Sequence, residues 1–138
     1  TLFRSWLVKP NHRELEAWIG HPLNSPDEII AAAKKLKAEG IANVIISMGA
    51  NGSLWLSDQA VIQAQPPKCE NVVSTVGAGD SMVAGLIYGI EKGLSQAETL
   101  AFASAVSAFA VSQSNVGVSD IALLEPILAN VKISVIEG

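Results

Sequence analysis

The sequence is poor in cysteine, in aromatic residues and in charge. Its single cysteine, Cys69, has no partner for a disulfide within the chain, so we expect a reducing compartment, the cytoplasm. Aromatic residues make up only 5% of the chain, which argues against a platform on which bases stack. Charged residues make up 16%, and the formal net charge of −4 offers no basic surface to release counterions from nucleic acid. We therefore expect no nucleic-acid partner.

Long apolar runs and a Walker A sequence are also missing. The most apolar helical stretch, residues 100–111, is shorter than the roughly 20 residues that a bilayer requires, so we expect no membrane partner. The absence of a Walker A sequence excludes a P-loop as the phosphate binder. The chain does not begin with Met, and it opens on a strand of the buried type, which leads us to expect part of a longer protein.

What the sequence does contain is an alternation of short apolar strands with helices. Apolar residues make up 49% of the chain, enough to form one globular core. The alternation predicts an α/β fold with a mostly parallel sheet flanked by helices. Strands are expected at 6–8, 43–48, 53–56 and 60–65, and helices at 12–19, 26–39, 80–91, from 96 onward and from about 120 to 131.

Local signals define several of these helices. Ser25 and Glu28, and likewise Ser95 and Glu98, have the spacing of a capping box. Pro126 is expected to kink the last helix or to mark its true start. The expected buried faces are Leu15, Trp18 and Ile19 on the first helix, Ile29, Ile30, Ala33, Leu36 and Ala38 on the second, and Val83, Leu86, Ile87 and Ile90 on the third, where Gly85 and Gly89 permit close approach of another backbone.

Residues 74–81, with the sequence STVGAGDS, form the stretch that most strongly indicates a catalytic or binding site. Gly77 and Gly79 let the backbone turn tightly and approach a ligand, and the turn opens a helix whose first N–H groups favour an anion. Asp80 follows in the first helical turn, where a carboxylate repels a bound anion and therefore needs another role. We interpret it as a general base in phosphoryl transfer.

Two other interpretations of this stretch are open. An aspartate in the first turn of a helix is favourable without any chemistry, and Gly-Ala-Gly also forms plain tight turns. A dinucleotide fingerprint fits less well, because Met82 stands where its third glycine belongs. The acid that follows about twenty residues later, Glu98, starts a helix instead of ending a strand.

Two further motifs each allow a structural and a functional interpretation. Asn11 and Glu14 are placed to cap the helix at 12–19. The segment 47–52, with the spacing Ser-x-Gly-x-x-Gly, fits a hairpin turn, but it also fits a backbone cradle at the carboxyl end of a strand, where open α/β sheets bind ligands.

The sequence STVGAGDSMVAG resembles the second signature of the ribokinase-like (PfkB) carbohydrate kinases, and the similarity extends from residue 6 to about 131. It implies the carboxyl-terminal, nucleotide-binding half of such a kinase, without the amino-terminal half that holds the sugar and the lid. Asp80 is then the catalytic base, and the N–H groups of Gly77, Ala78 and Gly79 stabilise the transferring phosphoryl group.

The resemblance also implies the cofactor sites. ATP is contacted by residues Lys9, Asn11, Ser47, Gly49, Gly52, Ser74 and Asn115. Glu14 and Asn11 help to hold Mg²⁺, largely through water. A monovalent cation binds between the signature loop and the loop at 112–117 in this family, but Ser74 replaces the usual acid there, so potassium dependence is left open.

The substrate follows from resemblance alone. The segments KPNHREL and VSQSNVG are most similar to family members that phosphorylate fructose 1-phosphate to fructose 1,6-bisphosphate. Kinases of fructose 6-phosphate and tagatose 6-phosphate are related alternatives, and a non-catalytic domain that binds nucleotide or another anion is the alternative from a different class. The expected partners are ATP and a sugar phosphate, with the complete enzyme a homo-oligomer.

Overall fold

The structure, a computed structural model, describes residues 6–67, 78–111 and 124–137. The chain divides into two compact units, which are described in turn. The first consists of Thr1–Gly49, Ser53–Gln63 and Val135–Gly138, and the second of Ala50–Gly52 and Ala64–Ser134.

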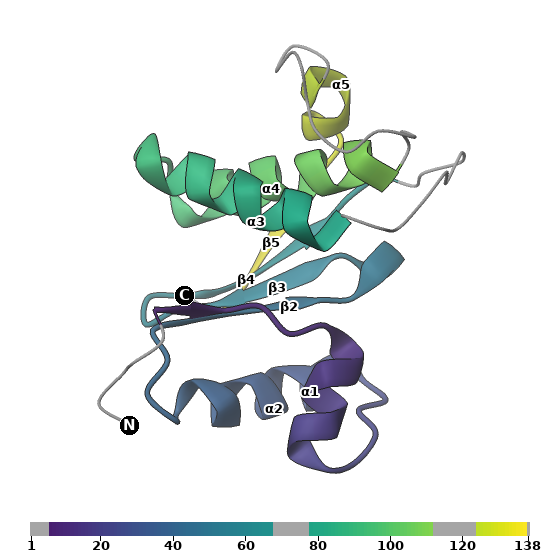
Figure 1. The fold of residues 1–138 in the computed structure, drawn as a ribbon, viewed down its shortest axis with the longest axis vertical. Coiled ribbons are helices and arrows are strands. Elements are labelled where there is room, and N and C mark those ends of the chain that lie inside the picture. Colours follow the sequence, from purple (N-terminus) through teal and green to yellow (C-terminus); the bar gives the residue numbers. More distant parts are fainter. Residues whose placement is uncertain (1–5, 68–77, 112–123, 138) are drawn as a thin grey trace. The chain divides into compact units, whose positions relative to one another are not determined.

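The protein has a five-stranded sheet, and each of its strands has residues in the first unit. Its order is β1-β2-β3-β4-β5, with β1 at Leu7–Val8, β2 at Asn43–Ser47, β3 at Ser53–Leu56, β4 at Val61–Gln65 and β5 at Lys132–Glu137 (Figure 1). Strand β2 runs parallel to β1 and antiparallel to β3, so the sheet is mixed. The predicted α/β class and four of these strands are confirmed.

Two helices of the first unit, α1 (His12–Ile19) and α2 (Pro26–Lys37), pack on β2, and α2 also contacts β3. Trp18 was predicted to lie on the buried face of α1, and this was wrong, because its side chain is 45% exposed. Around the helix Trp18 lies about 60° to one side of Leu15 and Ile19 about 40° to the other, and it is the Ile19 side that packs against the core. The core cluster comprises Leu15, Leu23, Ile29, Ile30, Ala32, Ala33, Val44, Ile46, Leu54, Leu56 and Val61.

Helix α2 begins as predicted but differs in its details. Ser25 caps it by accepting the Glu28 N–H at 3.2 Å. The Glu28 carboxylate accepts the N–H of Asn24, at 3.0 Å, so the predicted reciprocal bond to Ser25 is not the one formed. The helix ends at Lys37 instead of Glu39, and residues 38–40 form a turn. Ala38 was predicted to lie on the buried face, and this was wrong, because it belongs to that turn and is exposed.

The second unit contains two helices that run side by side, α3 (Ala78–Glu91) and α4 (Gln96–Val111) (Figure 1). A Cβ atom at Gly85 would lie 2.8 Å from Ala103 Cα, and one at Gly89 would lie 2.7 Å from Thr99 Cγ2. The predicted close approach of another backbone is confirmed at Gly85, whereas at Gly89 the close neighbour is the Thr99 side chain. Together the two contacts set the rotation of α3. The buried stripe of α3 therefore follows the glycines, through Met82 and Leu86.

The same rotation exposes two residues that were predicted to be buried. Ile87 is 51% and Ile90 37% exposed, because both lie away from the glycine side that meets α4. The Ser95–Glu98 capping box of α4 is confirmed, with the Glu98 N–H donating to Ser95 Oγ at 3.1 Å and the Ser95 N–H donating to Glu98 Oε1 at 3.2 Å.

The chain ends in a short helix and a strand that were only partly predicted. Helix α5 spans Glu125–Leu128 with Pro126 in its first turn, so the proline marks a helix start, as one of the two interpretations held. Strand β5 was missed, because most of its residues are exposed and it lacks a clear apolar alternation. Within the described parts of the chain, no helix combines the length and the apolar character needed to cross a bilayer.

A buried asparagine ties three segments of the first unit together. Asn43 donates through Nδ2 to the carbonyl oxygen of Trp6 at 3.1 Å and accepts through Oδ1 from Trp55 Nε1 at 2.9 Å. Its bonds thus connect β2 with β3 and with the residue before β1. Sequence patterning gave no sign of this contact, since the residues that it joins are far apart in the chain.

We predict that Asn43→Ala lowers the free energy of unfolding by about 1–3 kcal/mol, because the buried Trp55 Nε1–H and the carbonyl of Trp6, in a partly buried bond, each lose a partner. Denaturant titration followed by tryptophan fluorescence measures the change. Asn130 is the control, since it bonds Pro126 O at 2.7 Å on the surface and Asn130→Ala should cost less than 1 kcal/mol. Equal effects of the two substitutions would contradict the prediction.

Candidate nucleotide-binding and catalytic site

The first group of predicted site residues gathers where β1 and β2 end. Because these strands are parallel, their carboxyl ends lie at the same edge of the sheet. There the Ser47 N–H donates to the Pro10 carbonyl at 3.1 Å, and Asn11 and Ser47 form an isolated parallel β-bridge. The half-buried Lys9 immediately precedes this contact. The structure thus brings Lys9 and Asn11 together with Ser47, which lies more than thirty positions further along the sequence.

Asn11 and Glu14 form a complete capping box at the start of α1. The Glu14 N–H donates to Asn11 Oδ1 at 2.8 Å, and the Asn11 N–H donates to Glu14 Oε1 at 2.9 Å. The capping interpretation of this pair is therefore confirmed. Both residues are exposed, and the capping box does not use Glu14 Oε2. This oxygen can therefore still accept a hydrogen bond or bind an ion from solvent.

The glycine segment after β2 forms a one-turn helix, η1 (Gly49–Asn51), before β3 returns antiparallel. The hairpin interpretation is thus confirmed. Both predicted glycines have left-handed backbone conformations, with φ +58° at Gly49 and φ +89° at Gly52. A Cβ atom at Gly52 would lie 2.0 Å from the Ala64 carbonyl oxygen, so this position accepts glycine alone without a backbone shift.

The second group belongs to the second unit and lies at the start of α3. Helix α3 begins at Ala78, two residues earlier than predicted, and Gly79 and Asp80 are exposed in its first turn. The first N–H groups of a helix have no partner within the helix, so they are available to an anion. The predicted residues Ser74, Gly77 and Asn115 lie outside the described part of the chain.

No side-chain cage for a metal is present in the residues that the structure describes, where no three His, Cys, Asp or Glu side chains cluster. Both histidines are placed against backbone carbonyls instead. His12 Nε2 lies 2.9 Å from Leu23 O, and His21 Nδ1 lies 3.0 Å from Pro22 O.

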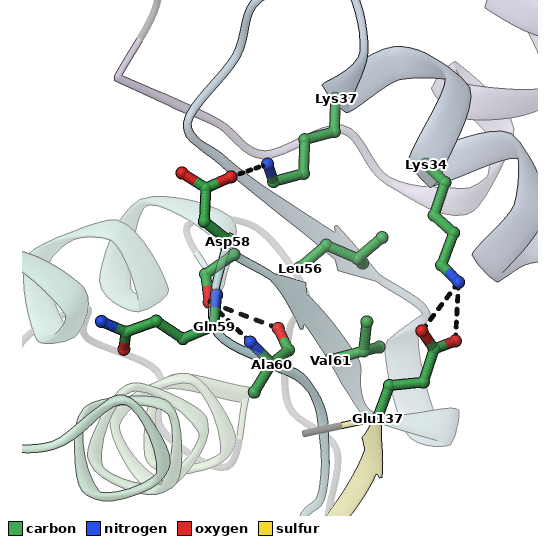
Figure 2. Close-up of a pocket in the computed structure, with 9 residues that line it drawn as sticks. Lys34, Lys37, Leu56, Asp58, Gln59, Ala60, Val61 and Glu137 are labelled. Carbon is green, nitrogen blue, oxygen red and sulfur yellow. Dashed lines mark hydrogen bonds and ion pairs between the residues drawn. The ribbon is translucent and has the colours of Figure 1, made fainter.

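A surface hollow of about 390 Å³ lies elsewhere in the first unit. Figure 2 shows Lys34 pointing to Glu137, with Nζ–Oε2 at 2.7 Å, and Lys37 pointing to Asp58. Leu56 lines the hollow and pairs with Val44, so the hollow lies at the opposite end of β2 from Ser47. Because each lysine already has a carboxylate partner, these two lysines do not form a free anion site.

Sequence reasoning missed two groups at the edge near Ser47. One is the Pro10 carbonyl, which no sequence pattern could have identified. The other is Ser53, which pairs with Ser47 across the β2–β3 ladder and whose buried hydroxyl has no hydrogen-bond partner among the described residues. Its position directly after Gly52 was the available signal.

The chain is similar in sequence to known proteins over almost its whole length. It is 77% identical over 135 residues to the 1-phosphofructokinase of Haemophilus influenzae, covering 98% of this chain and 43% of that protein. It is 53% identical over 126 residues to the 1-phosphofructokinase of Escherichia coli K12, covering 91% of this chain and 40% of that protein. The chain thus spans less than half of the length of these curated relatives.

Solved structures agree on the fold. Phosphofructokinase-2 from Escherichia coli, in complex with substrates and products, matches with a TM-score of 0.82 and 31% identity, over 91% of this chain and 41% of that one. Ribokinase from Arabidopsis thaliana, complexed with ribose and ATP, matches with a TM-score of 0.80 and 27% identity, over 88% and 40%. The fold is therefore ribokinase-like. Residues 2–122 match the pfkB family carbohydrate kinases, and the chain belongs to that family.

Proposed function

We propose that this chain is the carboxyl-terminal, nucleotide-binding half of an enzyme that phosphorylates fructose 1-phosphate to fructose 1,6-bisphosphate with ATP. The observation that carries the proposal is the 77% identity to a 1-phosphofructokinase over 98% of the chain. The sugar-binding half is then supplied by sequence outside these residues.

The roles of the residues follow the chemistry of phosphoryl transfer. The sugar hydroxyl attacks the γ-phosphorus of ATP, its proton passes to the Asp80 carboxylate, and ADP leaves as the bond to its β-phosphate oxygen breaks. The N–H groups of residues 77–80 stabilise the charge on the transferring phosphoryl group. The exposed position of Asp80 in the first turn of α3 supports this assignment, because a substrate can reach its carboxylate.

ATP is held at the edge where β1 and β2 end. The proposed contacts there are Lys9, Asn11, Ser47, Gly49 and Gly52, and Ser74 and Asn115 complete the set. The bridge between Asn11 and Ser47 supports a common site for these two residues. The left-handed Gly49 supports a backbone cradle, because no atom lies within 4 Å of where its Cβ atom would be and a phosphate oxygen can approach there.

The donor set at Asn11 and Glu14 fits Mg²⁺ that keeps most of its waters. It offers oxygen atoms only, and one Glu14 oxygen is already engaged in the capping box. Such a sparse set suits a strongly hydrated ion, which would neutralise phosphate charge when bound. Ser74, in place of the usual acid, leaves potassium dependence to measurement.

The complete polypeptide, assayed with ATP and a panel of sugar phosphates, tests the function. The highest kcat/KM is expected with fructose 1-phosphate. Preference for fructose 6-phosphate or tagatose 6-phosphate would reassign the substrate within the family. Nucleotide binding without any transfer would instead support a non-catalytic binding domain.

We predict that Glu14→Gln raises the magnesium concentration needed for the half-maximal rate by about three- to tenfold, since a neutral amide attracts the hydrated ion less strongly. Magnesium titration at constant ATP measures this. Glu98→Gln is a matched control, because Glu98 makes an equivalent capping box at α4. If both variants lose the same stability and neither alters the titration, Glu14 is a cap only.

A further inference from the structure

One backbone residue after α1 is held by two side chains of that helix, and we infer from this contact that His12 is a positioning residue for the proposed nucleotide and magnesium site. The contact consists of His12, Glu16 and Leu23, which we call the Leu23 clamp. What the site binds rests on the proposed function, but the geometry of the clamp does not.

The clamp satisfies both polar groups of the Leu23 backbone. The Leu23 N–H donates to Glu16 Oε2 at 2.8 Å, and the Leu23 carbonyl oxygen lies 2.9 Å from His12 Nε2. His12 and Glu16 are one helical turn apart, with Nε2 and Oε2 3.4 Å from each other. Two neighbouring side chains of α1 therefore hold one residue, as a paired strand would.

The partners of the imidazole determine its hydrogen-bonding state. A carbonyl oxygen and a carboxylate oxygen are both acceptors, so Nε2 of His12 carries a proton and donates. A glutamine at this position also presents an N–H donor on a side chain of similar length. An alanine removes the donor and leaves the Leu23 carbonyl without its partner in the clamp.

The clamp acts on the site because of where its members lie. His12 is the first residue of α1 and directly follows Asn11, which caps that helix and bridges to Ser47. Leu23 is only 2% exposed and belongs to the core cluster, so it is a fixed point. His12 thereby connects the first turn of α1 to the core.

Helix α1 needs such a connection because it has only eight residues. Isolated helices shorter than about 12–15 residues are marginal in water, so tertiary contacts must set the direction of this one. Its only fully buried side chain is Leu15. Without His12, the first turn loses one of the tertiary contacts that hold it, beside the bridge to Ser47 and the Glu16 bond, so the orientation of Asn11 and Glu14 is less firmly set.

The test compares three variants of the complete enzyme in ATP and magnesium kinetics. His12→Ala should raise KM for MgATP about three- to tenfold, the range set by one hydrogen bond, while kcat stays within twofold because Asp80 is not in the clamp. His12→Gln should restore KM to within twofold. His21→Ala is the matched control and should change neither constant, since among the described residues this exposed histidine bonds only its neighbour Pro22.

Several outcomes would overturn the inference. They are an unchanged KM in His12→Ala, a loss in His12→Gln as large as in His12→Ala, or an equal fall in kcat and kcat/KM. A measurement that needs no variant is the ¹⁵N NMR of the His12 ring in the wild-type protein, which should show the proton on Nε2, and a ring protonated on Nδ1 alone would refute the clamp. If the wild-type enzyme transfers no phosphate, the proposed function fails, while the NMR result still decides the clamp.

Discussion

Asp80→Asn should lower the turnover of the complete enzyme by about 10²–10⁴-fold, the range that general bases contribute, with little change in ATP affinity. The amide keeps the size and the position of the side chain, which is exposed in the first turn of α3, but it cannot accept the hydroxyl proton. Removing a carboxylate beside bound phosphate does not weaken ATP binding, because the charge repelled the phosphate. Steady-state kinetics together with ATP calorimetry separate the two effects.

Asp27 provides the matched control for this experiment. It is also an exposed acid in the first turn of a helix, α2, so it interacts with the helix dipole in the same way. Asp27→Asn and Asp80→Asn should each cost about 0.3–1 kcal/mol of stability, but only the second should affect turnover. If Asp80→Asn kept a third of wild-type turnover under conditions in which chemistry limits the rate, Asp80 would be only a helix-terminal acid.

Gly52→Ala should lower the free energy of unfolding by about 2–5 kcal/mol, a range that reaches the upper end for single substitutions. Two causes add. An alanine at φ +89° is strained by roughly 1–2 kcal/mol, and its Cβ atom would lie 2.0 Å from the Ala64 carbonyl oxygen. Because that neighbour is backbone, no change of rotamer relieves the overlap, which should cost a further 1–3 kcal/mol. Urea titration measures the sum.

Gly20→Ala separates the two causes. Gly20 has φ +91°, almost the same conformation as Gly52, but no atom lies within 4 Å of where its Cβ atom would be. This variant should therefore show the conformational strain alone, about 1–2 kcal/mol. If the two variants were equally stable, the overlap at Ala64 would not constrain Gly52, and its glycine would serve conformation or ligand approach only.

The candidate site was predicted in composition but not in arrangement. The sequence identified the capping residues Asn11 and Glu14, the two glycines after β2 and the acid at the start of α3. Each is recognisable from residues within a few positions of it, because caps and tight turns are made by local hydrogen bonds and local backbone conformation. The bridge between Asn11 and Ser47 joins segments that are distant in the chain, so it appears only in the folded structure.

Sequence periodicity alone was a weaker guide to burial. Helix α3 offers apolar residues on more than one side, so periodicity could not decide which side is buried. The choice was made by Gly85 and Gly89, whose missing side chains let α4 approach at Ala103 and Thr99, and Ile87 was left exposed as a result. Trp18 was also misplaced, since periodicity did not show that α1 packs its Ile19 side, and not its Trp18 side, against the core cluster.

By itself, the sequence determined where the helices α1, α2 and α4 begin, and which residues carry the signature of a sugar kinase. These features depend on contacts between residues near one another in the chain. Only the tertiary structure decided that β2 has one parallel and one antiparallel neighbour, that Asn43 joins Trp6 to Trp55, and that His12 holds Leu23. These contacts form between segments that many residues separate, and their geometry depends on how every intervening element packs.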